Sequence, residues 1–538
     1  MFVSRKSIWG HTGKVMALAL TLALNGACGD DDDDEGGGDN KPGDSVKVTG
    51  KVTYDFVPAV YSTATRAGTL AFSQVTKKPV RGAVIQVRQG NTILSNATTD
   101  DQGNYEITYK VPSSGSLTIV ALAKTTTPSI QVEDNTDGDA VWGVGTSLPS
   151  NAKTRDMHAG HGWTGGAYNA EQRFAAPFAI LDSMYTAARA FMNVRPVQFP
   201  ELKVNWSPNN VPGAGEKDDG NIGTSHFSPS DNEIYILGKD GVDTDEFDSH
   251  VIVHEWGHYF ESNLSRSDSP GGPHGAGDVL DPRLSFGEGY GNALAAIILP
   301  ESMYVDTVWS QRTGALAAFG FDAETAPSPS DDPEPGVFSE SSVMRILYDL
   351  YDSGSNESAY DNVSFGLGTF YDVLTGPQKA TDALTTLGSF VNGLKAQSGV
   401  NTSAVHALLA HYRVGAVTSD FGDGDTSLRA IYTPVASVPY NTNVTLTGGV
   451  EANKRQQNQY FVFTGTGRTM NISVSNLSED VDVEVYRRGT VVAAGYLSGT
   501  SPESVTFSSQ ANTQYVLVVT GYKEADGVYG ASVSITSP

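Results

Sequence analysis

The chain has almost no cysteine and a shortage of basic residues. One cysteine occurs in 538 residues, so no disulfide can form within the chain. Lys and Arg total 35 against 61 Asp and Glu, which gives a formal net charge of −26. Nucleic-acid binding needs basic surface to displace the counterions of the phosphates. We therefore expect no nucleic-acid partner.

Long hydrophobic runs are also missing, apart from one near the amino terminus. The apolar segment Val15–Leu24 follows Lys14 and is too short to span a bilayer as a helix. A basic start, an apolar centre and small residues up to Ala27 are typical of an export signal. We therefore expect an extracytoplasmic protein.

The single cysteine, Cys28, stands directly after Gly26 and Ala27. This arrangement resembles the lipobox of bacterial lipoproteins, in which the cysteine becomes the lipidated first residue, although Asn25 replaces the usual apolar residue. The resemblance implies a lipid anchor that holds the protein at the outer-membrane surface of the cell envelope. Ordinary cleavage after Ala27, with release of the mature chain, is the alternative.

Changes in composition divide the chain into five segments. Residues 1–27 are the export signal, and residues 28–45, rich in Asp and Gly, form a solvated tether that cannot bury a core. Residues 46–148 and 438–538 show the alternation of β-strands, whereas residues 150–435 show helical periodicity. Helices are expected at 174–192, 288–299, 341–351 and 387–394. The expected fold class is multidomain, with an α+β catalytic domain flanked by two all-β sandwiches.

The strongest chemical signal is the pentapeptide His254-Glu255-Trp256-Gly257-His258. Positions i and i+4 share one face of a helix, so His254 and His258 can bind a single Zn²⁺. Glu255 lies beside them and can act as general base towards a water that the zinc acidifies. The helix is expected to begin among the acidic residues 243–248. Two histidines on an ordinary amphipathic helix are the alternative.

A third ligand is expected in the segment 285–296. Glu288 and Asn292 are four residues apart at the start of an apolar helical run, so both project from one face. Glu288 can complete the metal site, and Asn292 can hydrogen-bond a ligand imidazole and fix its tautomer. Glycines at 287, 289 and 291 would let this helix approach the first one closely.

An HExxH motif followed by a downstream glutamate resembles the gluzincin metallopeptidases. The segment Gly287–Asn292 is most similar to the Gly-Glu-Gly-Trp-Ser-Asp of the fungalysin type, with Asn292 in place of the usual Asp. A metzincin would need Gly at 261 and His at 264, where this chain has Glu and Leu. An aspzincin would take Asp278 or Asp281 as its third ligand, and this alternative stays open.

Gluzincins also use a later residue to stabilise the oxyanion, a His in thermolysin-like and a Tyr in aminopeptidase-like enzymes. No motif identifies that residue here. Tyr348 and Tyr351, on an expected helix, are candidates, although their i, i+3 spacing also fits ordinary helix aromatics. His274 is the other candidate, because it lies in a Gly- and Pro-rich loop between the two metal-binding helices.

A β-hairpin is expected before the HExxH helix, with arms at 223–227 and 232–237. An exposed edge beside the zinc could bind an extended peptide by strand addition. A hairpin buried in the core is an equal alternative.

Two further segments resemble known modules. Residues 82–107 resemble the carboxypeptidase regulatory-like sandwich, whose role is usually positional. The strands expected at 459–463, 470–474, 481–486 and 515–519 make residues 438–538 resemble the bacterial pre-peptidase C-terminal domain. That domain is appended to secreted peptidases, so the resemblance favours a peptidase by association.

These patterns predict an exported zinc metallopeptidase that acts on protein or peptide substrates. The first alternative is a surface adhesion or glycan-binding protein with a relic zinc domain, which the intact Glu255 opposes. The second is an HExxH hydrolase that acts on a bond outside proteins. Calcium is a second candidate cofactor through the acidic loops 134–139 and 420–425, which also fit as solvated turns.

Overall fold

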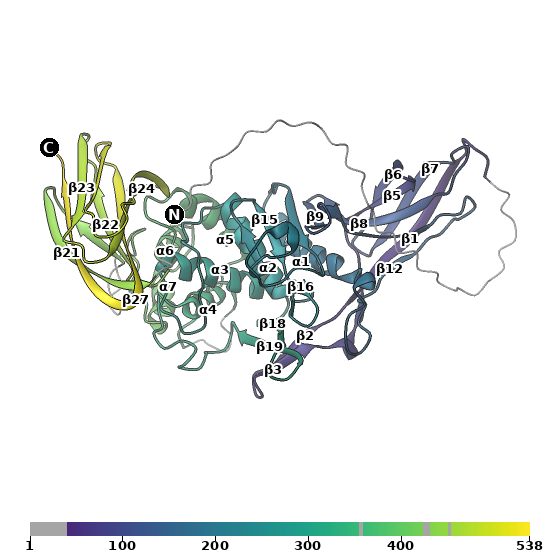
Figure 1. The fold of residues 1–538 in the computed structure, drawn as a ribbon, viewed down its shortest axis with the longest axis horizontal. Coiled ribbons are helices and arrows are strands. Elements are labelled where there is room, and N and C mark those ends of the chain that lie inside the picture. The colour runs from purple at the N-terminus through teal and green to yellow at the C-terminus, as the bar shows by residue number, and fades with distance from the viewer. Residues whose placement is uncertain (1–39, 354–358, 423–430, 450–452) are drawn as a thin grey trace.

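The computed structural model describes residues 40–353, 359–422, 431–449 and 453–538. Figure 1 shows an elongated arrangement, with β-strands at either end and helices between them. The protein is therefore multidomain and rich in β-structure. Within these ranges, no helix is both long and apolar enough to cross a bilayer. Cys28 and the expected export signal lie outside the described residues.

The amino-terminal region is built from twelve strands. The long strand β1 pairs antiparallel with β4 and β7 and parallel with β12. Burial alternates along β7, as a strand with one face on the core requires. The strands are β1 (Ser45–Phe56), β2 (Ala59–Ser62), β3 (Ala67–Leu70), β4 (Thr76–Pro79), β5 (Ala83–Gln89), β6 (Thr92–Thr98), β7 (Asn104–Lys110), β8 (Thr118–Thr126), β9 (Ser129–Asp134), β10 (Ala140–Val141), β11 (Gly143–Ser147) and β12 (Met157–Ala159).

One sheet joins this region to the helical part of the chain. Its strand order is β14-β15-β13-β9-β8-β5-β6, with β13 (Leu202–Trp206), β14 (His226–Ser228) and β15 (Glu233–Ile236) supplied from beyond residue 200. Strand β13 pairs parallel with β9, so Leu202 lies opposite Ile130. The boundary expected between residues 148 and 150 therefore falls inside a continuous sheet and does not separate two folding units.

The helices expected at 174–192, 341–351 and 387–394 lie within two residues of their predicted bounds, whereas the helix expected at 288–299 begins six residues earlier, at Pro282, and the HExxH helix begins later than predicted. That helix, α2 (Ser249–Asn263), begins later than expected, because Asp243–Thr244 form the short strand β17. The Asp248 carboxylate does not cap the helix. It accepts hydrogen bonds from the N–H and hydroxyl of Thr307 at 2.7 and 2.9 Å.

The α-helices of the described residues all lie in the middle of the chain. They are α1 (Ala175–Val194), α2, α3 (Pro282–Ile298), α4 (Glu340–Tyr351), α5 (Leu367–Val373), α6 (Leu387–Lys395) and α7 (Thr402–His411). Helix α1 packs behind α2, where Phe191 stacks on Phe260 with ring centroids 4.6 Å apart. The strands β16 (Gly238–Lys239), β17, β18 (Met303–Ser310) and β19 (Ala315–Asp322) form a separate antiparallel sheet.

The carboxy-terminal strands form a β-sandwich whose longest strand, β27, pairs in both of its sheets. Tyr432, Tyr460, Val516 and Val518 belong to the same buried cluster as the helices, whereas a second cluster of buried apolar side chains fills the interior of the sandwich. The strands are β20 (Tyr432–Val435), β21 (Tyr440–Gly449), β22 (Asn458–Thr464), β23 (Thr469–Ser475), β24 (Asp480–Arg487), β25 (Thr490–Gly495), β26 (Glu503–Ser508) and β27 (Gln514–Thr536).

Asp281 joins this sandwich to α3. Its carboxylate is fully buried and accepts hydrogen bonds from the backbone N–H and Nε of Arg283 at 3.0 and 2.9 Å. The Asn458 amide at 2.6 Å and the Tyr460 hydroxyl donate to it from β22. At the same interface, Asp278 forms an exposed ion pair with Lys454 at 2.6 Å.

The two aspartates predict very different stability effects. Asp281→Asn leaves the buried Arg283 without its counter-charge, so we expect the free energy of unfolding to fall by about 3 kcal/mol or more. Asp278→Asn removes only an exposed pair and should cost less than about 1 kcal/mol. Urea denaturation followed by tryptophan fluorescence measures both. Equal losses in the two variants would contradict the role given to Asp281.

Candidate metal centre

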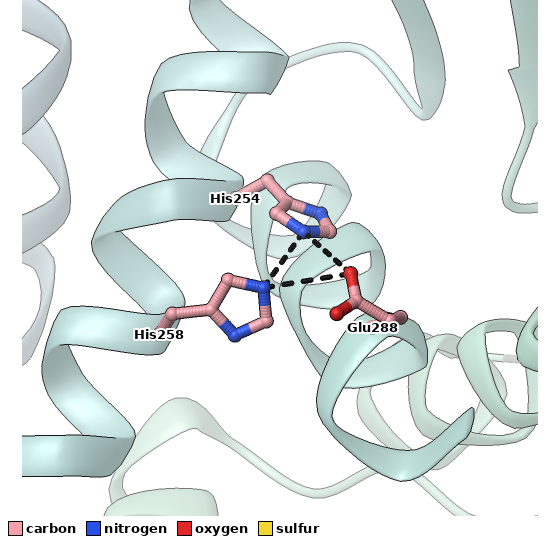
Figure 2. Close-up of side chains that lie close together, drawn as sticks. All are labelled: His254, His258 and Glu288. Carbon is pink, nitrogen blue, oxygen red and sulfur yellow. Dashed lines mark hydrogen bonds and ion pairs between the residues drawn. The ribbon is translucent and has the colours of Figure 1, made fainter. Parts of the chain in front are cut away.

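Three side chains from α2 and α3 converge on one point (Figure 2). His254 Nε2 lies 3.0 Å from His258 Nε2 and 3.2 Å from Glu288 Oε2, and His258 Nε2 lies 3.5 Å from the same oxygen. Ligands bound tetrahedrally to zinc at 2.0–2.2 Å are about 3.3 Å apart. Two imidazoles and a carboxylate are also a donor set that zinc prefers. The cluster therefore fits a zinc ion.

Glycines set the distance between the two helices at this point. A Cβ at Gly291 would lie 2.8 Å from the ring of His254, and a Cβ at Gly257 would lie 3.4 Å from the Cα of Gly291. At Gly289, a Cβ would meet Val343 of α4 at 2.7 Å. Gly287 is different, because its Cβ would meet its nearest neighbour at an ordinary 3.6 Å. Two of the three expected glycines therefore stand at close contacts.

Each histidine is held from behind by a polar side chain. His254 Nδ1 lies 2.8 Å from Asn292 Oδ1, and the Asn292 amide donates to Glu340 Oε1 at 2.7 Å. His258 Nδ1 lies 3.6 Å from the buried carboxylate of Glu261. With Nδ1 donating to Asn292, the Nε2 lone pair of His254 is directed towards the cluster. An Asp at position 292 would place its carboxylate next to that of Glu340, and the two charges would repel. The Asn292 amide avoids this repulsion because it can donate a hydrogen bond to Glu340.

The sequence reasoning missed Glu261 and Glu340. Glu261 stands three residues after His258, a spacing that puts both on one helix face and could have indicated the contact. Glu340 belongs to the first turn of α4, far along the chain from the motif. Acidic residues are common there for helix stability alone, so its sequence context held no distinguishing signal.

The charges in the cluster are strongly coupled. Burial lowers the pKa of His258, but the Glu288 carboxylate more than offsets this and raises that pKa well above its usual value. Burial acts in the opposite direction on Glu288, and the charge of His258 together with hydrogen bonds from the histidines brings the Glu288 pKa well below its usual value. A cation is thus strongly favoured at this position, whether a proton or a metal ion.

Glu255 lies beside the cluster and is anchored to a strand. Its Oε2 accepts a hydrogen bond of 2.8 Å from the backbone N–H of Phe227, and the side chain is only 8% exposed. Phe227 belongs to β14, the terminal strand of the shared sheet, where it lies opposite Ile234 of β15. The expected hairpin is therefore present, and its edge strand faces the motif.

His274 also reaches the cluster. Its Nε2 lies 3.4 Å from Glu288 Oε2 and 3.7 Å from Glu340 Oε2. Burial opposes protonation of His274, but the hydrogen bond and charge of Glu288 raise its pKa to about 9. The loop between α2 and α3 thus brings the His274 imidazole next to the carboxylates of Glu288 and Glu340.

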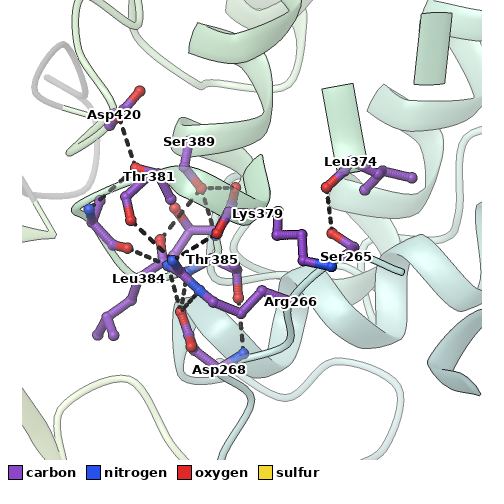
Figure 3. Close-up of polar contacts among 12 residues, drawn as sticks. Ser265, Arg266, Asp268, Leu374, Lys379, Thr381, Leu384, Thr385, Ser389 and Asp420 are labelled. Carbon is purple, nitrogen blue, oxygen red and sulfur yellow. Dashed lines mark hydrogen bonds and ion pairs between the residues drawn. The ribbon is translucent and has the colours of Figure 1, made fainter. Parts of the chain in front are cut away.

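The start of this loop is fixed to the segment before α6 (Figure 3). Arg266 pairs with Asp268 at 2.9 Å and donates to the carbonyl of Thr381 at 2.9 Å. Asp268 and Thr385 exchange two hydrogen bonds of 2.9 and 2.8 Å. Ser265 donates to the carbonyl of Leu374 at 2.6 Å. These bonds restrict the loop that carries His274.

The other sequence candidates lie elsewhere. Glu340, at the start of α4, is next to the site, and Tyr348 follows eight residues later, about 12 Å along the helix axis. Tyr351 packs against Phe370 of α5. Neither tyrosine is brought into the cluster. Asp278 and Asp281, the alternative third ligands, are engaged at the carboxy-terminal domain interface.

In the described parts of the two acidic loops, Asp134 and Asp420 are engaged in hydrogen bonds within the protein. The Asp134 carboxylate accepts hydrogen bonds from the N–H and hydroxyl of Thr136 at 2.9 and 2.8 Å, and these local bonds are typical of a turn. The Asp137 side chain is exposed. Asp420 accepts from Thr381 and Asn392, and the rest of the 420–425 loop lies partly outside the described residues.

Two solved structures that match this chain each cover about a fifth of it. No protein-family profile and no curated protein match the chain. The pre-peptidase C-terminal domain of a Bacillus anthracis collagenase matches with 16% identity over 20% of this chain and 92% of that one, at a TM-score of 0.16. PliG, a periplasmic inhibitor of g-type lysozyme from Aeromonas hydrophila, matches with 12% identity over 20% and 96%, also at 0.16.

The contact at Gly291 predicts a sharp difference between two similar substitutions. Gly291→Ala should displace His254 and weaken zinc binding by at least about tenfold, an effect of the size seen when residues that orient ligands are lost. Gly287→Ala has room for its methyl group and gains the same helix propensity, so it should bind zinc as the wild type does. Competition with a zinc-sensitive dye measures both affinities. Equal affinities in the two variants would show that the helix contact does not position His254.

Proposed function

We propose that this protein is an exported zinc-dependent metallopeptidase. The observation that supports this most directly is the convergence of His254, His258 and Glu288 within 3.0–3.5 Å. The side chains fit zinc in donor type and in spacing. An α+β catalytic domain of gluzincin type is the architecture that we assign to the helical region.

Glu255 is the general base in this proposal. Zinc held by the three ligands would supply a water whose pKa is lowered to about 7. The N–H of Phe227 holds one carboxylate oxygen of Glu255 at 2.8 Å, so the base has a fixed orientation. It accepts the proton of the attacking water and passes it to the leaving amine, which balances the hydrolysis of the peptide bond.

His274 is the residue to which we assign the hydrogen bond to the developing oxyanion. Its Nε2 is 3.4 Å from Glu288 Oε2, on the side of the cluster that the loop covers. Tyr348 and Tyr351 were the other candidates, and their distance along α4 makes them poorer ones. A donor that meets charge only in the transition state raises kcat more than it changes KM.

The proposed substrate is an extended stretch of polypeptide. Strand β14 is the terminal strand of its sheet, and Phe227 in that strand directs its N–H at Glu255 and away from β15. A peptide lying along this edge would bind by strand addition, with main-chain hydrogen bonds that any sequence can make. The edge therefore favours a peptide over a non-peptide substrate.

We further propose that the protein works outside the cytoplasm, either lipid-anchored through Cys28 or released after cleavage. The flanking β domains would then position the catalytic region at the cell envelope. An adhesion protein with a relic site is the weaker interpretation, because a lost activity would not preserve the Phe227 contact with Glu255 together with all three ligands.

The ligand assignment predicts which substitutions remove the metal. The wild type should hold about one zinc per chain, and His254→Ala, His258→Ala and Glu288→Ala should lose it. Asp278→Asn is the control, because this aspartate was an alternative third ligand and pairs with Lys454 instead. Elemental analysis by mass spectrometry gives the stoichiometry. Zinc that stays with Glu288→Ala but leaves Asp278→Asn would transfer the third position to Asp278.

The base assignment predicts a loss of turnover without loss of metal. Glu255→Gln keeps its shape and can still accept from Phe227, but it cannot take a proton from water. We therefore expect zinc to stay bound while kcat falls by about 10²- to 10⁴-fold. The rate is measured as the cleavage of a quenched fluorescent protein substrate by the exported chain. The same reaction with an added chelator, which removes the metal, gives the background rate. Wild-type turnover in Glu255→Gln would refute the mechanism.

A further inference from the structure

A second cluster of acidic side chains lies outside the zinc site. Asp243 of β17, Asp245 in the turn before α2 and Asp306 of β18 each place a carboxylate oxygen within 4.8 Å of the others. Asp248, at the entry to α2, is close enough for its charge to act on Asp245. Three carboxylates from two strands and a turn thus surround one small volume, and a fourth lies near it.

One carboxylate oxygen in each of Asp243, Asp245 and Asp248 is buried without a hydrogen-bond partner. Asp245 is 4% exposed and Asp248 is fully buried. In each, Oδ2 accepts a hydrogen bond, from Ser225 in Asp245 and from Thr307 in Asp248, whereas Oδ1 is buried without any hydrogen-bond partner. Asp243 Oδ1 is unpartnered in the same way. Buried polar groups are almost always paired, so these oxygens require an explanation.

No basic side chain among the described residues neutralises the cluster. None of the four aspartates forms an ion pair with Lys, Arg or His in the described ranges. The nearby buried Arg173 is paired with Glu246 instead. Burial, together with the charge of Glu246, raises the pKa of Asp243 to about 6, and burial, together with Asp243, raises that of Asp306 to about 7. A counter-ion would relieve this repulsion.

We propose that Asp243, Asp245 and Asp306, assisted by Asp248, bind a structural Ca²⁺ ion. Calcium takes oxygen ligands at 2.3–2.6 Å, so two ligands of one ion lie up to about 5 Å apart, which fits the spacing of these oxygens. The cluster offers no nitrogen or sulfur for zinc. Magnesium demands a tight octahedron and usually retains several waters, which suits a buried group of carboxylates less well.

The ion would brace the elements that hold the general base. Asp245 accepts from the Ser225 hydroxyl, which in turn accepts from the N–H of Leu237 at 2.9 Å. Ser225 precedes Phe227 by two residues, and Phe227 holds Glu255. Asp248 and Thr307 tie the start of α2 to β18. The effect on catalysis rests on the proposed function, but calcium binding itself does not.

Calcium titration of the mature chain, stripped of metal and reloaded with one equivalent of zinc, tests the site. We expect calorimetry to detect one Ca²⁺ per chain and the melting temperature to rise with calcium. Asp306→Asn should weaken calcium binding by about 100-fold or more, because losing a ligand costs at least as much as losing a residue that orients one. Asp137→Asn, in the loop 134–139, is the control and should bind as the wild type does.

A second measurement separates loss of the site from misfolding. Without calcium, Asp306→Asn relieves repulsion among buried carboxylates, so its melting temperature should equal or exceed that of the wild type. The proposal is overturned if wild-type protein binds no calcium, if Asp306→Asn binds it as tightly, or if Asp137→Asn alone loses it. These readouts use no peptidase activity, so failure of the zinc or base assignment remains distinguishable.

Discussion

The close approach of α2 and α3 is the contact on which the site depends. A helix surface without side chains at Gly257 and Gly291 lets the His254 ring lie directly against the facing backbone. At that separation Glu288 can share the space between two imidazoles, and Asn292 can reach the far nitrogen of His254. A side chain of even one carbon would move the helices apart, and the ligands would no longer converge.

Around this contact, the molecule buries several charged groups that are compensated in different ways. Arg173 with Glu246 and Asp281 with Arg283 are neutralised by ion pairs and hold segments together. The charge of Glu288 is balanced by His254 and His258, and a bound metal ion could balance it instead. The aspartates at β17 and β18 have no such protein partner among the described residues. Burying a charge without a compensating partner is costly. Each buried cluster therefore indicates the kind of counter-charge or bound ion that it needs.

Local patterns in the sequence predicted much of the site. The spacing of residues along a helix is a local property of the sequence. The helical period alone therefore predicted that His254 and His258 share one helix face, and that Glu288 and Asn292 share another. What could not be predicted was pairing across long stretches of chain. The contacts of Glu340 with Asn292 and of Phe227 with Glu255 depend on tertiary packing. The start of α2 was misplaced for the same reason, because Asp243 and Thr244 pair with Lys239 and Gly238 as the short strand β17.

The sheet that joins the amino-terminal strands to β13 has a consequence for how this protein can be divided. Strands β5, β8 and β9 complete the hydrogen bonding of the sheet whose far edge is β14. Removing them would expose one side of β13 and leave a short three-stranded remnant to support that edge. The amino-terminal region therefore cannot be shed like a propeptide or exchanged like a modular appendage. It is a structural part of the unit that carries the His254, His258 and Glu288 cluster.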